Sequence, residues 1–368
     1  MLIGIDASRA VTARRTGTET YSLYLIRELL ALGAEHSFRL YFRRPPPPDL
    51  FKGADLCVIP FPRLWTHLRL SWEMLRRPPD LLFVPAHVLP LVHPRRSVVT
   101  IHDLGFLSHP EAHTRGQNLY LRWSTRHNAR AAAHILADSE ATRRDLVRHY
   151  RTPPEKITVV YPGRDESLAP VTDPAALAAV RRRYGLTGPY LLYVGTLHPR
   201  KNLLRLLRAF HRLRPAARNL QLVLAGKKGW LYDEIFAQVR DLGLGDRVLF
   251  PGYVPAEDLP ALLGGATAFV YPSLYEGFGF PVLEAMACGT PVVCSNVSSL
   301  PEVAGDAALL VDPLDVEALA SALARVVDDE GLRRELRARG FEQVRRFSWR
   351  RCAEQVLAVL EEVGRGRR

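Results

Sequence analysis

The chain has 368 residues, of which 47% are hydrophobic and 24% are charged. A chain of this length is longer than a single hydrophobic core usually supports, which predicts two domains, and the composition excludes a disordered chain. The net charge of +12 is uneven, because residues 1–190 hold 27 Lys and Arg against 17 Asp and Glu, whereas the remainder holds 23 against 21.

The chain opens on MLIGIDASRA, which predicts a first strand rather than a signal peptide. No apolar run reaches the roughly 18 residues that a membrane-spanning helix needs, so we expect a cytoplasmic protein. The four cysteines have no C-x-x-C spacing and are expected to be buried free thiols rather than zinc ligands or disulfides: Cys57, Cys288, Cys294 and Cys352.

Short apolar, β-branched runs alternate with helical patterns through the first half of the chain. This alternation is typical of a parallel sheet covered by helices on both faces. The expected helices include residues 19–32 and 114–133. The expected strands are residues 2–6, 38–42, 56–60, 81–85, 97–101, 134–138 and 157–161.

A stretch rich in Pro, Gly and Asp interrupts the pattern at residues 161–177. After a short helix the alternation restarts at residues 190–194 and continues with LQLVLAG, RVLF, TAFVYP, TPVVCS and ALLV. We therefore predict two doubly wound α/β domains, residues 1–170 and 171–348, that face one another across a cleft. Ligands of such sheets bind at the carboxyl ends of the strands.

The stretch FPRLWTHLRLSWEMLRR, residues 61–77, is amphipathic and places Leu64, Leu68, Trp72 and Leu75 on one helical face. Its aromatic side chains and arginines suit a helix that lies on a membrane surface. The alternative, which we favour, turns the apolar face to the core. The basic first half could also attract a phosphorylated substrate or nucleic acid. No nucleic-acid-binding motif accompanies the charge, so nucleic acid is not an expected partner.

The most informative motif is EGFGFPVLE, residues 276–284, which follows the strand TAFVYP and opens a helix. Gly277 and Gly279 permit positive φ and let a ligand approach the backbone, and Pro281 suits the first helical position. The helix N-terminus offers unpaired N–H groups to a phosphate. A stray dinucleotide fingerprint is the alternative, but Val282 occupies the third glycine position.

Two carboxylates flank this turn, Glu276 before it and Glu284 one helical turn inside. A carboxylate beside a phosphate would be repelled, so each is expected to accept hydrogen bonds from hydroxyl groups. A ribose diol and a sugar supply such hydroxyls. A nucleotide joined to a sugar therefore satisfies the whole motif, unless Glu284 is simply a solvated helix residue.

A second motif is YVGTLHPRKNL, residues 193–203, in which Gly195 turns the chain after a strand. Arg200 and Lys201 stand where a helix begins. Two cations there would neutralise a diphosphate and stabilise it as a leaving group. The alternative is a solvated basic turn.

In the first domain, His102 and Asp103 end the strand of VVTIHDLGFL. A lone histidine at a strand end is often structural, but its expected position opposite the second-domain motifs favours a functional role. The first turn, RRTGTETY, contains Gly17, whose neighbouring N–H groups could approach a phosphate or an acceptor.

Together these motifs resemble the retaining glycosyltransferases of family 4, which have the GT-B fold. EGFGFPVLE is similar to their E-x7-E motif, and CGTPVVCSNVSSLPEVAGDAALLVDPLD is similar to the segment that follows it. FSWRRCAEQVL resembles their closing helix, which crosses back onto the first domain, so residues 349–368 are assigned to that domain. The resemblance covers essentially the whole chain and is strongest over residues 190–315.

The resemblance implies roles for the residues around the glycine turn. Glu284 would hold the ribose hydroxyls. Glu276 would contact the donor sugar, with help from backbone N–H groups around Phe278 and Gly279.

For the remaining motifs the resemblance implies that Lys201 binds the diphosphate and that His102 lies beside the anomeric carbon. Tyr253, in the loop PGYVP, would flank the base. Thr196 stands where many family members carry Arg, and Arg200 would supply the missing charge. No D-x-D motif is present, so no divalent ion is implied.

We therefore predict a retaining, metal-independent hexosyltransferase of cell-surface polysaccharide synthesis, with GDP-mannose as the favoured donor and a glycan or lipid-linked acceptor. No cofactor is expected, because the sugar nucleotide is a co-substrate. Peripheral association with the inner face of the plasma membrane is left open. The alternatives are a UDP-sugar-dependent transferase of the same family, a phosphorylase or epimerase of the same fold, and a non-catalytic subunit that binds sugar nucleotides.

Overall fold

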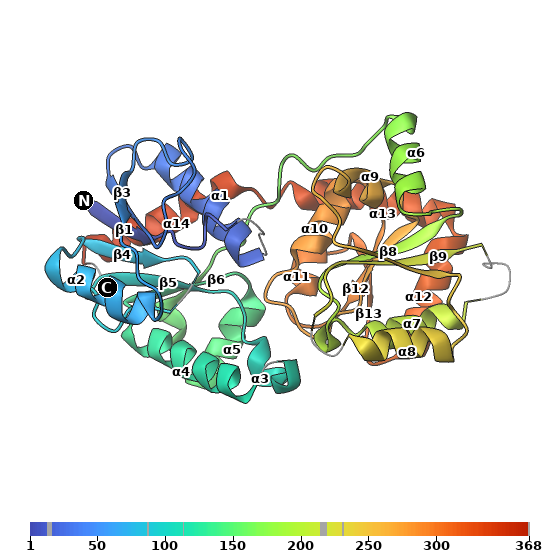
Figure 1. Ribbon diagram of the computed structural model, residues 1–368, viewed down its shortest axis with the longest axis horizontal. Helices are drawn as coiled ribbons and strands as arrows, with labels where there is room; N and C mark the ends of the chain where they lie inside the picture. The colour runs from blue at the N-terminus through green and yellow to red at the C-terminus, as the bar shows by residue number, and fades with distance from the viewer. Residues whose placement is uncertain (13–16, 87, 113, 214–218, 230–231, 367–368) are drawn as a thin grey trace. The chain divides into compact units, whose positions relative to one another are not determined.

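The protein is represented by a computed structural model that describes residues 1–12, 17–86, 88–112, 114–213, 219–229 and 232–366. It divides into two compact units with helices on both faces of each sheet (Figure 1). Unit 1 comprises Met1–Gly163 and Phe347–Arg368, and unit 2 comprises Arg164–Arg346. The sequence prediction places these boundaries a few residues later in the chain, at 170/171 and 348/349.

Unit 1 is built on a seven-stranded parallel sheet in the order β3-β2-β1-β4-β5-β6-β7. All seven strands overlap the predicted ones, because runs that are buried on both faces are apolar throughout. The strands are β1 (Leu2–Asp6), β2 (Ser37–Phe42), β3 (Asp55–Val58), β4 (Leu81–Val84), β5 (Ser97–Ile101), β6 (His134–Ala137) and β7 (Ile157–Val159).

The helices of unit 1 start where the sequence offers capping side chains. Thr114 and Gln117 form a reciprocal capping box at the start of α4, and Ser139 accepts a hydrogen bond from Thr142 N at the start of α5. The helical segments are α1 (Gly17–Leu32), η1 (Trp65–Leu70), α2 (Ser71–Arg76), α3 (Gly105–Ser108), η2 (Pro110–Ala112), α4 (Arg115–Ala131), α5 (Glu140–Tyr150), η3 (Pro154–Lys156) and α14 (Trp349–Gly364).

Helix α14 returns to unit 1 and packs against α1, which confirms the predicted crossing. The ring of Trp349 stacks on Tyr24 with 5.5 Å between centroids and meets the edge of Tyr21 at 5.9 Å. At Gly163, a Cβ would lie 2.2 Å from the Trp349 backbone nitrogen. Only glycine therefore lets the end of unit 1's first segment pass this close to α14.

Residues 61–77 do not form the single core-facing helix that we favoured. Leu64 has a φ of 54°, and the segment continues as a π-helical stretch, η1, before α2 begins. Trp65, Leu70 and Met74 occupy the core instead. The predicted apolar face is therefore turned outward, with exposed fractions of 63%, 50%, 53% and 62% for Leu64, Leu68, Trp72 and Leu75.

Unit 2 is built on a six-stranded parallel sheet in the order β10-β9-β8-β11-β12-β13. Its strands are β8 (Tyr190–Val194), β9 (Gln221–Ala225), β10 (Val248–Gly252), β11 (Ala268–Tyr271), β12 (Val292–Ser295) and β13 (Ala308–Val311). Its helical segments are α6 (Pro174–Arg183), η4 (Pro199–Lys201), α7 (Leu203–His211), α8 (Asp233–Asp241), α9 (Leu259–Gly264), α10 (Phe280–Ala287), α11 (Leu300–Ala304), α12 (Val316–Asp328) and α13 (Glu330–Val344).

The two sheets confirm the predicted pair of doubly wound α/β domains. That they face one another across a cleft stays a prediction. All four cysteines are free, and Cys57 differs from the expectation in being only partly buried. None of the helices in the described part of the chain is long and apolar enough to cross a membrane.

Candidate active site

The direction of strand order in unit 2 reverses between β8 and β11. The loop after β8 leads to η4, and the loop after β11 leads to α10. Open parallel sheets bind ligands at the carboxyl ends of the strands where the order reverses. Both predicted motifs of unit 2 therefore stand at the place in this sheet where a ligand is expected.

A buried ion cluster joins these two loops. Lys201 Nζ lies 2.5 Å from Glu276 Oε1 and donates a hydrogen bond to Tyr271 Oη at 2.8 Å. Arg200 lies 3.2 Å from the other carboxylate oxygen of Glu276, Oε2, and also donates a hydrogen bond to the Tyr275 carbonyl. The side chains of Glu276 and Lys201 are only 11% and 10% exposed. The structure thus brings together three residues that the sequence analysis selected from two separate motifs.

The cluster fixes the charge of Glu276. Burial alone would raise the pKa of this carboxyl, but Arg200 and Lys201 outweigh burial and lower the pKa to about 2. Glu276 is therefore a carboxylate, and the two cations leave the cluster with one net positive charge. This charge suits an anionic ligand that carries hydroxyl groups.

Hydrogen bonds from the start of α11 hold the backbone around Glu276. Glu276 N donates to Ser298 Oγ at 2.9 Å, and Ser299 Oγ lies 3.0 Å from the Glu276 carbonyl and 2.6 Å from the Phe278 carbonyl. Ser298 itself adopts a positive φ of 54°. The position of Glu276 is thus set by the backbone and not only by its ion pairs.

The two glycines of the turn before α10, Gly277 and Gly279, differ in backbone conformation. Gly279 has a φ of 123° at the N-cap of α10, and a Cβ there would approach Leu300 Cδ2 to 2.8 Å. Gly277, which could also adopt a positive φ, does not do so. Phe278 between them is buried. The helix begins at Phe280, so Pro281 takes its second position rather than its first.

Glu284 lies within α10 and is partly exposed. Burial and the neighbouring Asp165 carboxylate raise its pKa from 4.5 to about 7. A carboxyl group with this pKa is about half protonated near neutral pH. Hydroxyl donors that hydrogen-bond to the carboxylate would favour its ionised form, as the predicted ribose contact requires.

Two further residues that are predicted to bind the sugar nucleotide are exposed in unit 2. Thr196 follows Gly195, and its carbonyl accepts a hydrogen bond from Tyr193 Oη at 3.0 Å. Tyr253 is 60% exposed, and Lys227 Nζ lies 5.3 Å from its ring centroid. An exposed aromatic ring beside a cation can stack on a base.

His102 lies in unit 1, at the end of β5. Its Nδ1 is 2.6 Å from Asp138 Oδ2 and its Nε2 is 2.9 Å from the Pro85 carbonyl oxygen, while Tyr21 meets the ring edge-on at 4.9 Å. Burial opposes the charged ring, but Asp138 outweighs burial, and the pKa of His102 is raised. An acceptor at each ring nitrogen favours the protonated ring, which can donate a hydrogen bond from both nitrogens.

Gly17, also in unit 1, is the exposed first residue of α1. Residues 14–16, which begin the RRTGTETY motif, lie outside the described residues. Asp103 accepts a hydrogen bond from Gly105 N at 2.8 Å at the start of α3. This bond ties Asp103 to the first residue of α3.

The sequence analysis missed four residues that contact the candidate residues: Tyr271, Ser298, Ser299 and Asp138. Asp138 was detectable, because it follows β6 directly and β6 pairs with the strand that ends at His102. Tyr271 likewise ends β11 beside the glycine motif. Ser299 has no signal in the sequence, since it bonds only to backbone carbonyls more than twenty residues away.

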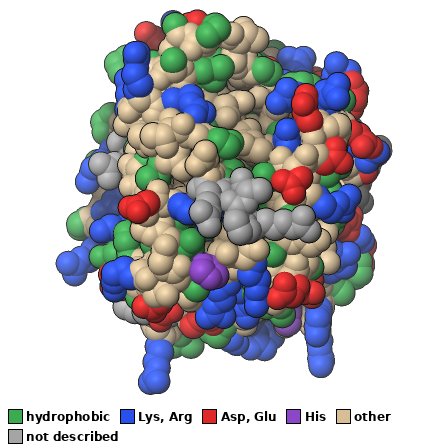
Figure 2. Space-filling view, turned by 90° about the vertical axis from the view of Figure 1, so that its right-hand side faces the viewer, with side chains coloured by type: hydrophobic (Ala, Val, Ile, Leu, Met, Phe, Trp, Pro, Cys, Tyr) green, Lys and Arg blue, Asp and Glu red, His purple; other side chains and the backbone are tan. Residues whose placement is uncertain are grey.

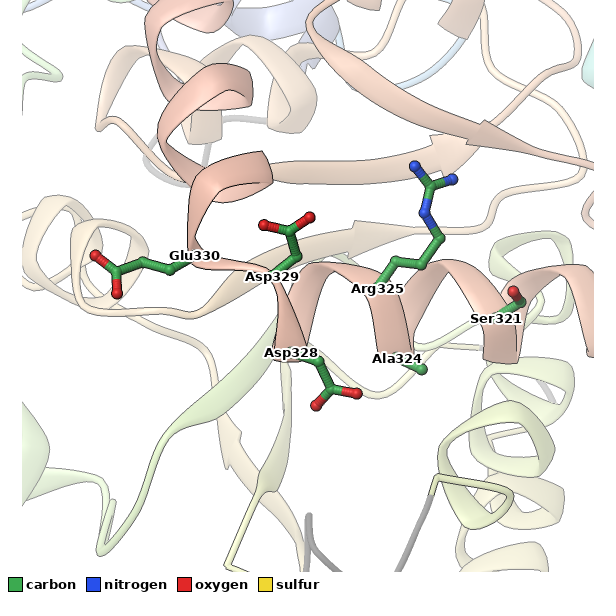
Figure 3. Close-up of a pocket in the computed structure, with 6 residues that line it drawn as sticks. All are labelled: Ser321, Ala324, Arg325, Asp328, Asp329 and Glu330. Atoms are coloured by element: carbon green, nitrogen blue, oxygen red, sulfur yellow. The ribbon is translucent and has the colours of Figure 1, made fainter.

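Other acidic groups stand apart from these motifs. A shallow pocket at the junction of α12 and α13 is lined by Asp328, Asp329 and Glu330, whose carboxylates point in different directions (Figure 3). Asp329 caps α13 by accepting a hydrogen bond from Leu332 N. None of the predicted site residues lines this pocket. It is therefore not the predicted donor site.

Two family descriptions match this chain. Residues 181–343 match "Glycosyl transferases group 1" and residues 15–168 match "Glycosyltransferase Family 4". The O-antigen chain mannosyltransferase B of Escherichia coli is 40% identical over 265 residues, which cover 71% of this chain and 69% of that relative. The MMP alpha-(1->4)-mannosyltransferase of Mycolicibacterium hassiacum is 35% identical over 243 residues, covering 64% and 55%.

Solved structures support the fold. Sucrose-phosphate synthase from Thermosynechococcus elongatus superposes with a TM-score of 0.77 at 23% identity, covering 98% of both chains. The HepE protein of Anabaena, solved with UDP and glucose, superposes with a TM-score of 0.76 at 19% identity, covering 98% of this chain and 99% of that one. The chain therefore belongs to the family 4 glycosyltransferases and is a glycosyltransferase of GT-B fold.

Proposed function

We propose that this glycosyltransferase moves mannose from GDP-mannose to a glycan or lipid-linked acceptor in the synthesis of a cell-surface polysaccharide. The observation that carries the proposal is the buried cluster of Glu276, Lys201 and Arg200 where the strand order of unit 2 reverses. The 40% identity to an O-antigen mannosyltransferase supports the choice of sugar and pathway class.

In this proposal the cluster opens when the donor binds. Lys201 and Arg200 transfer part of their interaction from Glu276 to the diphosphate, and Glu276 accepts hydrogen bonds from the hydroxyls of the sugar. Glu284 accepts hydrogen bonds from the ribose diol, and Tyr253 stacks on the base. Backbone N–H groups from Phe278 onward contribute at the N-terminus of α10.

The transfer proceeds with retention at the anomeric carbon. The bond between that carbon and the diphosphate oxygen breaks, and a bond to the acceptor hydroxyl oxygen forms on the same face. The acceptor proton passes to the departing phosphate oxygen, and GDP leaves as the second product. Lys201 and Arg200 stabilise the leaving charge, so no metal ion is needed. Asp138 orients His102, and its Nε2 exchanges the Pro85 carbonyl for a hydroxyl of the sugar when the donor binds.

We also propose that the enzyme works in the cytoplasm at the inner face of the plasma membrane. A lipid-linked acceptor is held at that surface, and unit 1 carries an exposed apolar face that suits it.

Thermal-shift measurements against GDP, UDP, ADP and dTDP and their sugars test the donor. GDP-mannose is expected to raise the melting temperature, since a ligand at about a hundred times its Kd stabilises a protein by roughly 2.7 kcal/mol. Transfer is then followed with EDTA present, and the anomeric configuration of the product is read by NMR. A β-linked product from the α-configured donor would overturn retention.

The matched variants are Glu284→Gln and Glu342→Gln. Glu342 is an exposed glutamate of unit 2 whose carboxylate pairs with Arg345. Only Glu284→Gln should abolish the shift. A shift with UDP-sugars alone would keep the enzyme class and overturn the mannose assignment. Binding without transfer to any acceptor of a broad panel would indicate a non-catalytic subunit.

A further inference from the structure

Exposed apolar side chains are concentrated on one part of unit 1. Thirteen large hydrophobic side chains are exposed among the described residues, and nine of them lie in three short segments. Four belong to η1, α2 and the residue before them, and two are Leu91 and Val92. The other three, Leu119, Tyr120 and Trp123, lie on α4 with exposed fractions of 72%, 46% and 43%.

The three segments are neighbours. His67 of η1 lies 2.9 Å from the Tyr120 hydroxyl of α4, and its ring is 5.4 Å from that of Trp123. Ser71 Oγ, at the start of α2, accepts a hydrogen bond from Val92 N at 3.2 Å. Residues 63–77, 91–96 and 115–130 therefore adjoin, and we call the side chains that they expose, with Glu73 beneath them, the apolar–arginine surface. Helices α2 and α4 are labelled in Figure 1.

The charge of this surface has one sign. Nine of its arginines are exposed, among them Arg63, Arg76, Arg122 and Arg126. Its one carboxylate, Glu73, is buried and lies 3.0 Å from Arg69. By contrast, on the face that Figure 2 shows, Asp and Glu side chains lie among the Lys and Arg side chains.

We propose that the apolar–arginine surface docks unit 1 onto an anionic lipid bilayer. Leucines inserted at the acyl boundary remove apolar area from water, tryptophan and tyrosine suit the interface, and the arginines meet lipid phosphates. A second copy of the chain is a poorer occupant, because it would bring arginines against arginines. The inference deepens the proposed function by placing the surface that keeps the enzyme near a lipid-linked acceptor.

Co-sedimentation with vesicles tests the proposal on the full chain. The wild type is expected to pellet with vesicles of phosphatidylcholine and phosphatidylglycerol but only weakly with phosphatidylcholine alone. Leu68→Ser combined with Trp72→Ser should weaken binding at least about tenfold, since both side chains are half exposed and lose apolar contact with the lipid. Arg122→Gln combined with Arg126→Gln should weaken binding by about fivefold for each charge and reduce its salt dependence.

The matched control is Leu310→Ser combined with Leu314→Ser, which removes two exposed leucines of unit 2. The control should pellet like the wild type. Trp65 is left unchanged, because it is buried and its indole donates to the Ile59 carbonyl. Equal melting temperatures of the variants show that each remains folded.

Three outcomes would overturn the proposal. One is binding that does not depend on the anionic lipid, and another is a surface variant that pellets like the wild type. The third is a concentration-dependent dimer that dissociates in the variant Leu68→Ser with Trp72→Ser. That result would make this surface an interface between two copies of the chain. Donor thermal shifts are measured on the same variants and should not change. A protein that binds vesicles but no sugar nucleotide would contradict the proposed function and still support the proposal that this surface binds lipid.

Discussion

The two units share one architecture but handle charge in opposite ways. Unit 1 holds 28 Lys and Arg against 17 Asp and Glu, whereas unit 2 holds 22 against 21. In unit 2, Lys201 is buried, Arg200 is partly exposed, and both cations pair with Glu276. Many arginines of unit 1 stand exposed beside exposed leucines.

This difference shows that the same parallel α/β fold accommodates charged side chains in different places, buried in one unit and exposed in the other. A buried ion pair gains little stability over apolar residues, but losing one partner is costly, so such a cluster tightly fixes geometry. Exposed charges contribute little to stability and remain available to an outside partner. We infer that unit 2 uses charge to position a small ligand and unit 1 uses it to attract a surface.

The largest effect should come from breaking the cluster in unit 2. Lys201→Met leaves Glu276 with only Arg200, and we expect a loss of about 3 kcal/mol in the free energy of unfolding because a buried carboxylate loses its nearest cation. Urea denaturation at pH 7 measures this loss. Lys52→Met, at a lysine that is 75% exposed, is the control and should change little.

A double variant separates stability from function in the same cluster. Lys201→Met with Glu276→Gln removes both charges and should recover most of the lost stability, yet it should bind no donor. If it is as unstable as the single variant, the ion pair does not explain the loss.

The next effect concerns Glu284 and depends on pH. The pKa of Glu284 is about 7 in the folded chain, against an ordinary value of 4.5. As the pH rises from 4.5 to 7, the unfolded chain loses this proton while the folded chain keeps it. The free energy of unfolding therefore falls over this pH range. Glu284→Gln should therefore be more stable than the wild type by about 2 kcal/mol at pH 8 and equal to it near pH 4. Parallel pH profiles for the two proteins would contradict this account, and Glu342→Gln serves again as the control.

The smallest effect should come from Asp138→Asn in unit 1. The raised pKa of His102 adds stability that is present in full below about pH 6.5 and is lost as the pH rises through the folded-state pKa. The variant should lose about 1 kcal/mol at pH 6 and less at higher pH.

The titration of His102 by NMR gives the direct check of that prediction, since its pKa should fall in Asp138→Asn. The exposed carboxylate variant Asp49→Asn should leave the titration unchanged. An unaltered pKa in Asp138→Asn would show that Asp138 does not hold the charge of the ring.

The sequence predicted the strands well and the site in part. Strands such as LLFVP and YLLYV are apolar on both faces. Such runs can be recognised from the local sequence, without knowing which elements pack against them. Glu276 and Lys201 could be selected as candidates because each follows a strand within a recognisable motif. That Arg200 also pairs with Glu276 could not be predicted, because the two residues are 76 positions apart and meet only when β8 and β11 adjoin.

The orientation of residues 61–77 was wrong for a related reason. This segment carries two apolar stripes, and either could face the core. Packing selected Trp65, Leu70 and Met74. Hydrophobic periodicity shows that a stripe exists, but the neighbouring elements decide which stripe is buried.

The return of α14 to unit 1 has a consequence for biosynthesis. Trp349 packs on Tyr21 and Tyr24 of α1, so unit 1 lacks part of its packing until unit 2 and α14 have both been translated. Unit 2 is one continuous segment and can complete its fold earlier. Unit 2 should therefore complete its fold before unit 1, whose α1 face stays uncovered until α14 has been translated.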